Sequence, residues 1–183
     1  QGHGERQPPA AERGRVERYF DPLPIWYPPF EEAQVDAAAF PLHAITQRPM
    51  FMYHAWGAQN AWLRQIAARN VLYLHPATAA KHGVADGDWV ELRSHLGAIE
   101  VPVRLAANVQ PDTVWTWNAL GKRRGAWRLD KDAPEGRRGF LLNHLIGDRT
   151  PDGAYANADP VTGQAAWFDL RVALRRIAPR EDS

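Results

Sequence analysis

Apolar and polar residues alternate with a period of two in several short stretches of the chain. The clearest stretch is 99–105, IEVPVRL, in which every second residue is apolar. This pattern is typical of a strand buried on one face, and the proline at 102 indicates that its outer edge is not fully paired. Further apolar or alternating stretches predict short strands at 41–46, 71–74, 89–94, 113–118 and 167–174. We therefore expect five to seven short strands.

The most informative stretch of the sequence runs from Val71 to Asn108. After its first strand, Pro76 is well placed to begin a short helix and Gly83 to end it. The sequence ADGD at 85–88 is typical of a turn, and Gly97 suits the turn of a following hairpin. The stretch therefore predicts a strand, a short helix, a tight turn and a two-stranded hairpin. Its aspartates are explained as turn formers.

Two short helices are predicted elsewhere, at Asn60–Arg69 and at 141–146. Asn60 is placed to cap the start of the first and Asn70 its end. The apolar residues at helical spacing in it are Trp62, Leu63 and Ile66. Long loops are expected at 47–60, 121–139 (rich in Arg, Lys and Gly) and 147–163. Short strands joined by long connections favour a mainly β, closed barrel, which leaves no sheet edge exposed.

The first forty residues differ from the rest of the chain. Residues 1–3 resemble the remnant of a tag-cleavage site, and the polar segment 4–14 is expected to be disordered. Residues 15–40 carry aromatic residues among prolines, which predicts an extended segment that lays its aromatics on another surface. That surface is either this domain's own barrel or a domain outside this sequence. The expected organisation is a lead-in at 1–14, the 15–40 segment, a barrel domain at 41–178 and a polar tail at 179–183.

Composition narrows the class of function. The net charge of +1 gives no argument for binding nucleic acid or an anionic membrane, and no apolar run approaches the ~18 residues that cross a bilayer. Without cysteine, the chain can hold neither a disulfide nor a thiolate-bound iron–sulfur cluster. Its histidines are not at metal-ligand spacing, and no nucleophile elbow, phosphate-binding glycine loop or dinucleotide fingerprint occurs. We therefore expect a binding domain without catalytic or metal-ligating residues of its own.

Eight tryptophans are many for a chain of 183 residues. Those at predicted strand or helix positions are most simply core residues: Trp62, Trp89 and Trp115. Those at loops or strand ends could instead stack on a planar ligand such as a guanine or pterin ring: Trp56, Trp117, Trp127 and Trp167. For each of these, ordinary packing is the alternative.

The sequence VLYLHPATAAKHGVADGDWVELRSHLGAIEVPVRL, from residue 71, resembles the C-terminal cofactor-binding domain of the molybdopterin oxidoreductases related to dimethyl sulfoxide reductase and formate dehydrogenase. The shared pattern is a strand, a proline-led helix with small residues, Gly-Val-x-Asp-Gly-Asp-x-Val and a hairpin through glycine. Three further motifs resemble the family in the same order: ITQRPMFMYHAWGAQNAWL, GFLLNHLI and DPVTGQAAWFDLRVAL. Together the four motifs cover about residues 41–175.

The resemblance implies a six-stranded double-psi β-barrel of the aspartate-decarboxylase type, with a few short helices and long loops. It also implies bis-molybdopterin guanine dinucleotide as cofactor, a large anionic ligand that needs many hydrogen-bonding side chains. Matching the motifs residue by residue gives the candidate cofactor-binding residues: Thr46, Gln47, Arg48, His54, Trp56, Gln59, Asn60, Asn143, Gln164 and Trp167. The Asp86-Gly87-Asp88 turn, by contrast, is expected to be scaffold.

In the resembled family, the molybdenum ligand and the cysteines of any iron–sulfur cluster lie in earlier domains. The chain is therefore expected to be a fragment of a molybdopterin-dependent oxidoreductase that is inactive alone. The implied chemistry is two-electron redox or oxygen-atom transfer, and the loop YHAWGAQNAWLRQI is most similar to members that act on sulfur oxyanions. Expected partners are the N-terminal domains of the same enzyme and electron-transfer subunits, with neither nucleic acid nor direct membrane insertion. The expected location is soluble, on the cytoplasmic or periplasmic face of a bacterial redox complex.

Two other classes of small β-barrel are alternatives. A stand-alone barrel subunit of a redox complex would bind a partner protein through the aromatics of residues 19–30. A self-processing enzyme of the aspartate-decarboxylase type needs a Gly-Ser cleavage site. The sequence has no Gly-Ser dipeptide, which argues against that class.

Overall fold

The computed structural model describes residues 7–28, 32, 34–54, 56–58, 60–118, 120, 139–149, 158–165 and 170–178. Its strands are β1 (Leu42–Gln47), β2 (Leu72–Leu74), β3 (Trp89–Arg93), β4 (Ala98–Leu105), β5 (Thr113–Trp117) and β6 (Leu170–Ile177). Its α-helices are α1 (Arg13–Tyr19), α2 (Ala61–Ile66) and α3 (Pro76–Lys81). Two 3-10 helices, η1 (Ala10–Glu12) and η3 (Leu142–Leu145), complete the described elements.

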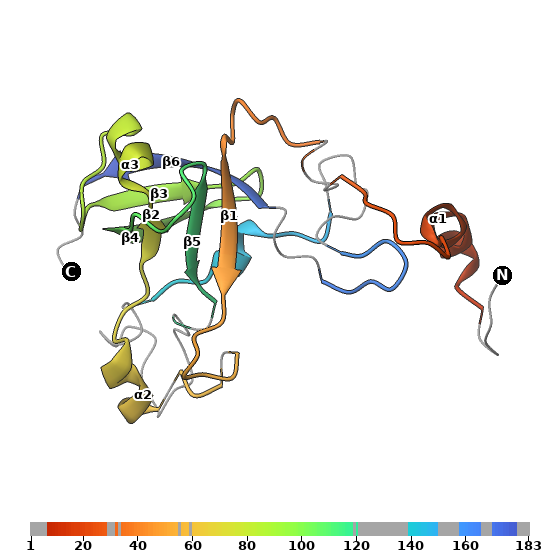
Figure 1. The fold of residues 1–183 in the computed structure, drawn as a ribbon, viewed down its shortest axis with the longest axis horizontal. Helices are drawn as coiled ribbons and strands as arrows, with labels where there is room; N and C mark the ends of the chain where they lie inside the picture. The colour runs from red at the N-terminus through yellow and green to blue at the C-terminus, as the bar shows by residue number, and fades with distance from the viewer. Residues whose placement is uncertain are drawn as a thin grey trace.

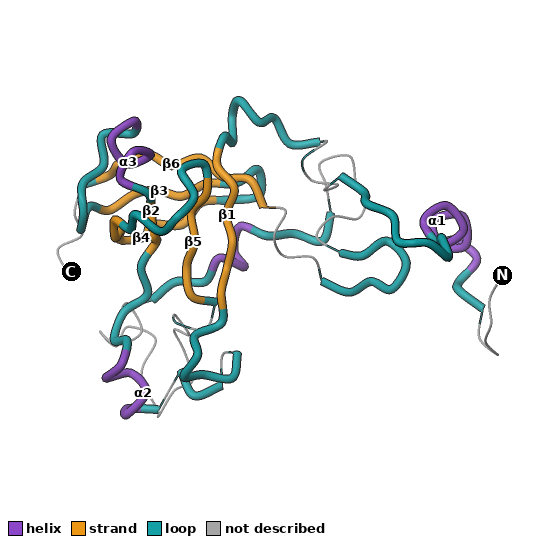
Figure 2. The backbone as a smooth tube through the Cα atoms, viewed as in Figure 1, coloured by secondary structure: helices purple, strands orange, loops and turns teal. Residues whose placement is uncertain are grey.

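The strands close into a barrel in the order β1-β5-β2-β4-β3-β6, and β6 returns to pair with β1 (Figures 1 and 2). β1 is parallel to β5 and β2 is parallel to β4, whereas the other neighbouring pairs are antiparallel. Parallel neighbours need crossover connections, so segments distant in sequence are interlocked around one core. The prediction of a mainly β, six-stranded double-psi barrel is confirmed.

The core is filled by the inward residues of all six strands, supplemented by residues of α3 and η3. Leu74, Leu92 and Leu170 are among its completely buried side chains. Burying one such side chain contributes about 1.5–3 kcal/mol, which makes this alternation the main source of stability. Pro102 lies where β4 pairs with β3 but not yet with β2, whose pairing begins at Val103. This explains how a strand proline is accommodated.

The predicted order of elements across the stretch from β2 to β4 is confirmed. α3 begins at Pro76, and Gly83 beyond its end has a φ of +64°, which favours glycine. The sequence did not reveal that the His75 side chain caps this helix, its Nδ1 accepting from the Ala77 amide at 3.1 Å. The turn after the helix uses Gly87 at a φ of +84°.

The helix predicted at Asn60–Arg69 is shorter than expected. α2 ends at Ile66, and Asn70 does not cap it but is buried. The prediction that Trp62 is a core residue is wrong, because its side chain is 79% exposed. α2 contacts a small separate cluster around Met52 and Leu120 through Leu63, so its other apolar side chains face outward.

The closing strand lies further along the chain than predicted. β6 runs from Leu170 to Ile177, so the strand continues three residues beyond its predicted end at 174 and stays inside the predicted barrel domain of 41–178. Arg175 pairs with Glu91 and Arg176 with Asp88, which fixes this end of the strand. The predicted start of the strand at 167–169 lies outside the described residues.

The N-terminal segment is partly helical, contrary to the prediction of a disordered and then extended segment. η1 and α1 occupy residues 10–19, between Pro9 and Pro22, where no proline interrupts a helix. Figure 1 shows α1 far from the barrel. Tyr19 packs edge-on against Tyr27, whereas Phe20 and Trp26 are exposed. Their packing on this domain's own barrel is therefore not observed. Among the described residues, no helix has the length and apolar character needed to cross a bilayer.

Candidate cofactor-binding site

The ends of β1 and β5 bring the first predicted site residues together. Because these strands are parallel, both end on the same side of the barrel, which faces α2 (Figure 1). Thr46 pairs with Thr116 and Gln47 with Trp117, and the amide of Asn118 donates to the Gln47 carbonyl at 3.0 Å. Thr46 is 9% exposed, whereas the Gln47 side chain is exposed. The strand ends therefore present polar side chains at one edge of the barrel.

The polar side chains of this edge are not used by the fold. Within the described part of the chain, Thr46, Gln47 and Arg48 make no side-chain hydrogen bond or ion pair. Asn143 lies on η3, whose main contacts are with β4, and its exposed side chain makes no hydrogen bond or ion pair in the described structure either. Two carboxamides, a hydroxyl and a guanidinium are thus available as donors and acceptors for a ligand.

Asn118 belongs to the same edge but was not among the predicted residues. Its side-chain oxygen is buried and accepts no hydrogen bond in the described structure. Turning the carboxamide over would bury its N–H groups instead, so either orientation calls for a partner that the described residues do not supply. The signal that could have identified Asn118 is its position directly after a strand, but the parallel pairing with β1 was needed to use it.

Asn70 connects the end of β5 with the segment that leads to Asn143. Its side-chain nitrogen donates to the carbonyls of Trp117 at 3.0 Å, Leu120 at 2.8 Å and Phe140 at 3.2 Å. The C-terminal end of η3 is held as well, because the Ser94 hydroxyl donates to the Leu145 carbonyl at 2.8 Å. Asn143 is therefore on a segment fixed at both ends.

The loop between β1 and α2 carries four more predicted residues, three of which the structure describes. His54 has a φ of +51°, which is uncommon for a residue with a side chain, and its ring contacts Tyr53 edge-on at 4.9 Å. Trp56 is 77% exposed, as a residue that stacks on a ligand requires. Asn60 is partly used by the fold, since its oxygen caps α2 by accepting from the Trp62 amide at 2.9 Å. Gln59 lies outside the described residues.

Gln164 is not brought to the edge formed by β1 and β5. It lies on the 158–165 loop, which extends from the barrel on the side of α1, whereas the β1–α2 loop lies beyond the strand ends (Figure 1). Its side chain is exposed, and its backbone carbonyl accepts from the Asp159 amide at 2.7 Å. The structure therefore gives Gln164 weaker support than Gln47 or Asn143. Trp167 lies outside the described residues.

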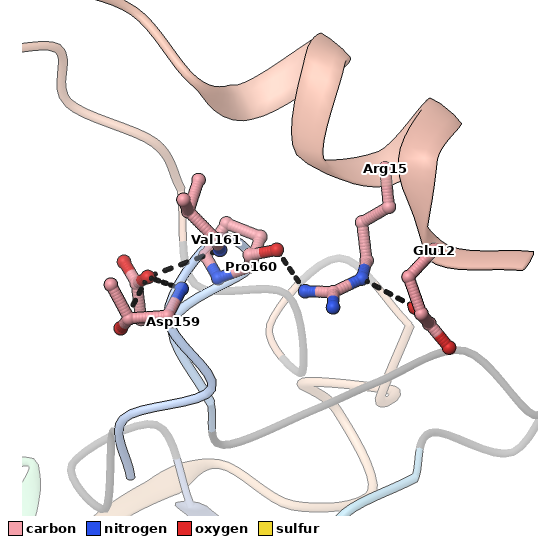
Figure 3. Close-up of polar contacts among 6 residues, drawn as sticks. Glu12, Arg15, Asp159, Pro160 and Val161 are labelled. Atoms are coloured by element: carbon pink, nitrogen blue, oxygen red, sulfur yellow. Dashed lines mark hydrogen bonds and ion pairs between the residues drawn. The ribbon is translucent and has the colours of Figure 1, made fainter. Parts of the chain in front are cut away.

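Asp159 organises the 158–165 loop. Its carboxylate accepts from the Thr162 amide at 2.6 Å, the Thr162 hydroxyl at 2.8 Å and the Val161 amide at 3.1 Å. Hydrogen bonding from the Thr162 amide, and then from its hydroxyl, holds the pKa of Asp159 below its ordinary value, with Arg15 adding a smaller effect. Figure 3 shows Arg15 between Glu12 and the Pro160 carbonyl, which joins α1 to this loop.

The aspartates of the 85–88 turn are used by the barrel itself. Asp86 accepts from the Leu105 amide at 2.7 Å, and Asp88 accepts from the Ala85 amide at 2.8 Å. These bonds account for both carboxylates without a ligand. Among the residues that the structure describes, no cluster of three or more His, Asp or Glu suited to a metal ion occurs.

Comparison with known proteins shows the family to which this chain is similar. The family model described as "Molydopterin dinucleotide binding domain" matches residues 42–158. A sulfite dehydrogenase subunit of Allochromatium vinosum is 54% identical over 180 residues, covering 96% of this chain and 19% of that protein. Dimethyl sulfoxide reductase DmsA of Escherichia coli is 29% identical over 130 residues, covering 70% of this chain and 15% of that protein.

Acetylene hydratase from Pelobacter acetylenicus has a similar fold. Its TM-score is 0.66 at 19% sequence identity, over 88% of this chain and 22% of that one. At that identity the likeness concerns the fold alone. The chain spans about a fifth of the length of the proteins to which it is compared. Since the family model matches well over half of the chain, the chain belongs to the molybdopterin dinucleotide-binding domain family.

Proposed function

We propose that this chain forms one wall of the binding site for bis-molybdopterin guanine dinucleotide in a larger molybdenum oxidoreductase. The observation that carries the proposal is the edge at the ends of β1 and β5. There Thr46, Gln47 and Arg48 have free polar groups, and Asn118 has a buried oxygen without a partner in the described structure. Polar groups that the fold leaves unsatisfied are candidates for binding a ligand.

The donor and acceptor set suits this cofactor. Guanine and pterin rings present N–H groups beside carbonyl oxygens, which the carboxamides of Gln47 and Asn143 can match as acceptor and donor together. The Arg48 guanidinium suits the charge of the diphosphate groups. Trp56, exposed on the neighbouring loop, suits the flat face of a ring. These residues would bind and orient the cofactor and exclude water, and none of them is assigned a proton-transfer role.

The bound molybdenum would supply two-electron redox or oxygen-atom transfer chemistry. A sulfur oxyanion is the proposed substrate class, supported by the 54% identity to a protein named as part of a sulfite dehydrogenase. The metal ligand and any iron–sulfur cluster would belong to other parts of the enzyme. Those parts, with electron-transfer subunits, are the proposed partners, in a soluble cytoplasmic or periplasmic position. The exposed Phe20 and Trp26 are consistent with a surface that such parts cover.

The test uses the full-length gene product with Gln47→Ala and Asn143→Ala combined. We expect its molybdenum and its acid-released guanosine monophosphate to fall by at least about half, since each change removes hydrogen bonds to the cofactor. The matched control combines Gln110→Ala and Asn108→Ala, the same chemical changes at exposed positions just before β5, at its opposite end. Equal cofactor content in the two double variants would refute the proposal.

A further inference from the structure

Asn70 is the most extensively hydrogen-bonded side chain in the described core. It is 1% exposed, just before β2. Its nitrogen donates to three carbonyls, those of Trp117, Leu120 and Phe140. Its oxygen accepts from the Val71 amide at 3.1 Å and from the Thr116 hydroxyl at 2.9 Å. Asn70 therefore has no free group left for a ligand, and its role must be exerted through its neighbours.

Its three acceptors belong to the segments that carry the candidate binding residues. Trp117 directly precedes Asn118, whose amide is bonded to the Gln47 carbonyl of β1. Phe140 lies three residues before Asn143. Because the Leu120 and Phe140 carbonyls bond the same nitrogen, they lie no further apart than the sum of those two bond lengths. Leu120 and Phe140 are thus held together at one point of the fold.

We propose that Asn70 is the positioning residue of the cofactor site, a role that rests on the function proposed above. It fixes the end of β5 and the approach to η3 against β2, so that Asn118 and Asn143 keep one relative position. Asparagine suits this role because it combines an acceptor with a two-hydrogen donor on a short side chain. Aspartate would place a carboxylate oxygen against three carbonyl oxygens, and leucine would leave these three carbonyls without the Asn70 donor.

Thr116 allows the role to be tested without removing Asn70. Its hydroxyl, completely buried, donates to the Asn70 oxygen and contacts the Val71 carbonyl at 3.0 Å. Thr116→Val removes this hydroxyl at nearly constant volume, and Thr116→Ser retains it. Thr78→Val is the matched control, because Thr78 is also buried and donates to a backbone carbonyl, that of Pro111, away from this site.

The experiment compares Thr116→Val, Thr116→Ser, Thr78→Val and Asn70→Asp. Amide hydrogen exchange is measured on this chain, and molybdenum and guanosine monophosphate content on the full-length gene product. We expect exchange at Val71 and Asn118 to rise about tenfold in Thr116→Val, the factor that corresponds to one net hydrogen bond. In Asn70→Asp, exchange at these two amides should rise further than in Thr116→Val. Cofactor content should fall in both variants, recover in Thr116→Ser and stay at wild-type level in Thr78→Val.

Unchanged exchange at Val71 and Asn118 would overturn the inference directly. It would also be overturned if Thr78→Val lost as much cofactor as Thr116→Val at the same melting temperature, because stability alone would then explain the loss. Faster exchange with full cofactor content, while Gln47→Ala with Asn143→Ala lose cofactor, would overturn the positioning role and leave the proposed function standing. Full cofactor content in all variants would refute the proposed function, and the inference with it.

Discussion

Two polar regions of this barrel differ in what their side chains bond. In the 85–88 turn, Asp86 and Asp88 are each bonded to backbone amides of the barrel. At the ends of β1 and β5, the side chains of Thr46 and Gln47 bond nothing in the described structure, and Asn118 buries a side-chain oxygen without a partner there. The first region is polar because its carboxylates accept the backbone amides that a tight turn leaves unpaired. The second makes sense once a ligand supplies the missing partners.

The aromatic residues show the same contrast. Trp115 stacks on Tyr73 of the neighbouring strand β2 with ring centroids 4.0 Å apart and planes 9° from parallel, so its ring face is covered although it lies outside the core. Trp56 and Trp62 lie on the α2 side and are mostly exposed. Polar and aromatic groups are thus satisfied around the barrel wall and left available beyond the strand ends. This contrast predicts that changes in the two regions separate stability from cofactor binding.

The largest expected effect is on the barrel wall. Leu74 of β2 is completely buried, and Leu74→Ala should lower the free energy of unfolding by about 2–5 kcal/mol. Urea unfolding measures this value. Leu23→Ala, on the exposed N-terminal segment, is the matched control and should change it by less than about 0.5 kcal/mol. If the two variants lost similar stability, the barrel would not be the main source of stability.

A smaller effect is expected at the 85–88 turn. Asp86→Ala removes the acceptor of the Leu105 amide and should cost about 1 kcal/mol in urea unfolding. The control is Asp112→Ala, since Asp112 is exposed and its carboxylate bonds nothing in the described structure. Full-length protein with Asp86→Ala should retain its cofactor. A loss of cofactor without a loss of stability would move this turn from scaffold to binding site.

Local sequence rules predicted the elements whose causes are local. Pro76 and Gly83 bound α3, and period-two alternation located the buried face of β4, because each depends on neighbours in the chain. The role of Asn70 was predicted incorrectly as a helix cap, because four of its five partners are 46 to 70 residues away. Asn118 was missed because only the parallel pairing of β1 with β5 places it beside Gln47. The resemblance named the family, and the topology then ranked the candidate residues.

At Asn118 the contrast predicts stability and binding changes of opposite sign. Asn118→Leu removes a buried oxygen that lacks a partner, so the free energy of unfolding should stay constant or rise by up to about 1 kcal/mol. Cofactor content of the full-length protein should fall. Asn108→Leu, at an exposed position, should leave the cofactor content unchanged and shift the free energy of unfolding by less than about 0.5 kcal/mol. A clear loss of stability in Asn118→Leu would show that this carboxamide serves the fold.

The smallest expected effect concerns the loop of Asp159, which is built like the 85–88 turn but lies on the side of α1. Its folded pKa is lowered, chiefly by the Thr162 amide, so the ionised carboxylate stabilises the loop above the unfolded pKa of about 3.9. That contribution should be lost as the pH falls through the folded pKa, and a carboxyl NMR titration measures it. Thr162→Val removes the hydroxyl donor and keeps the backbone amide, so the pKa of Asp159 should rise only part of the way to its unfolded value. If the pKa of Asp159 were the same in the folded chain and in a short loop peptide, the bonds from Val161 and Thr162 would not order the loop. The Pro160 carbonyl that bonds Arg15 would then lie on a turn that Asp159 does not hold in place.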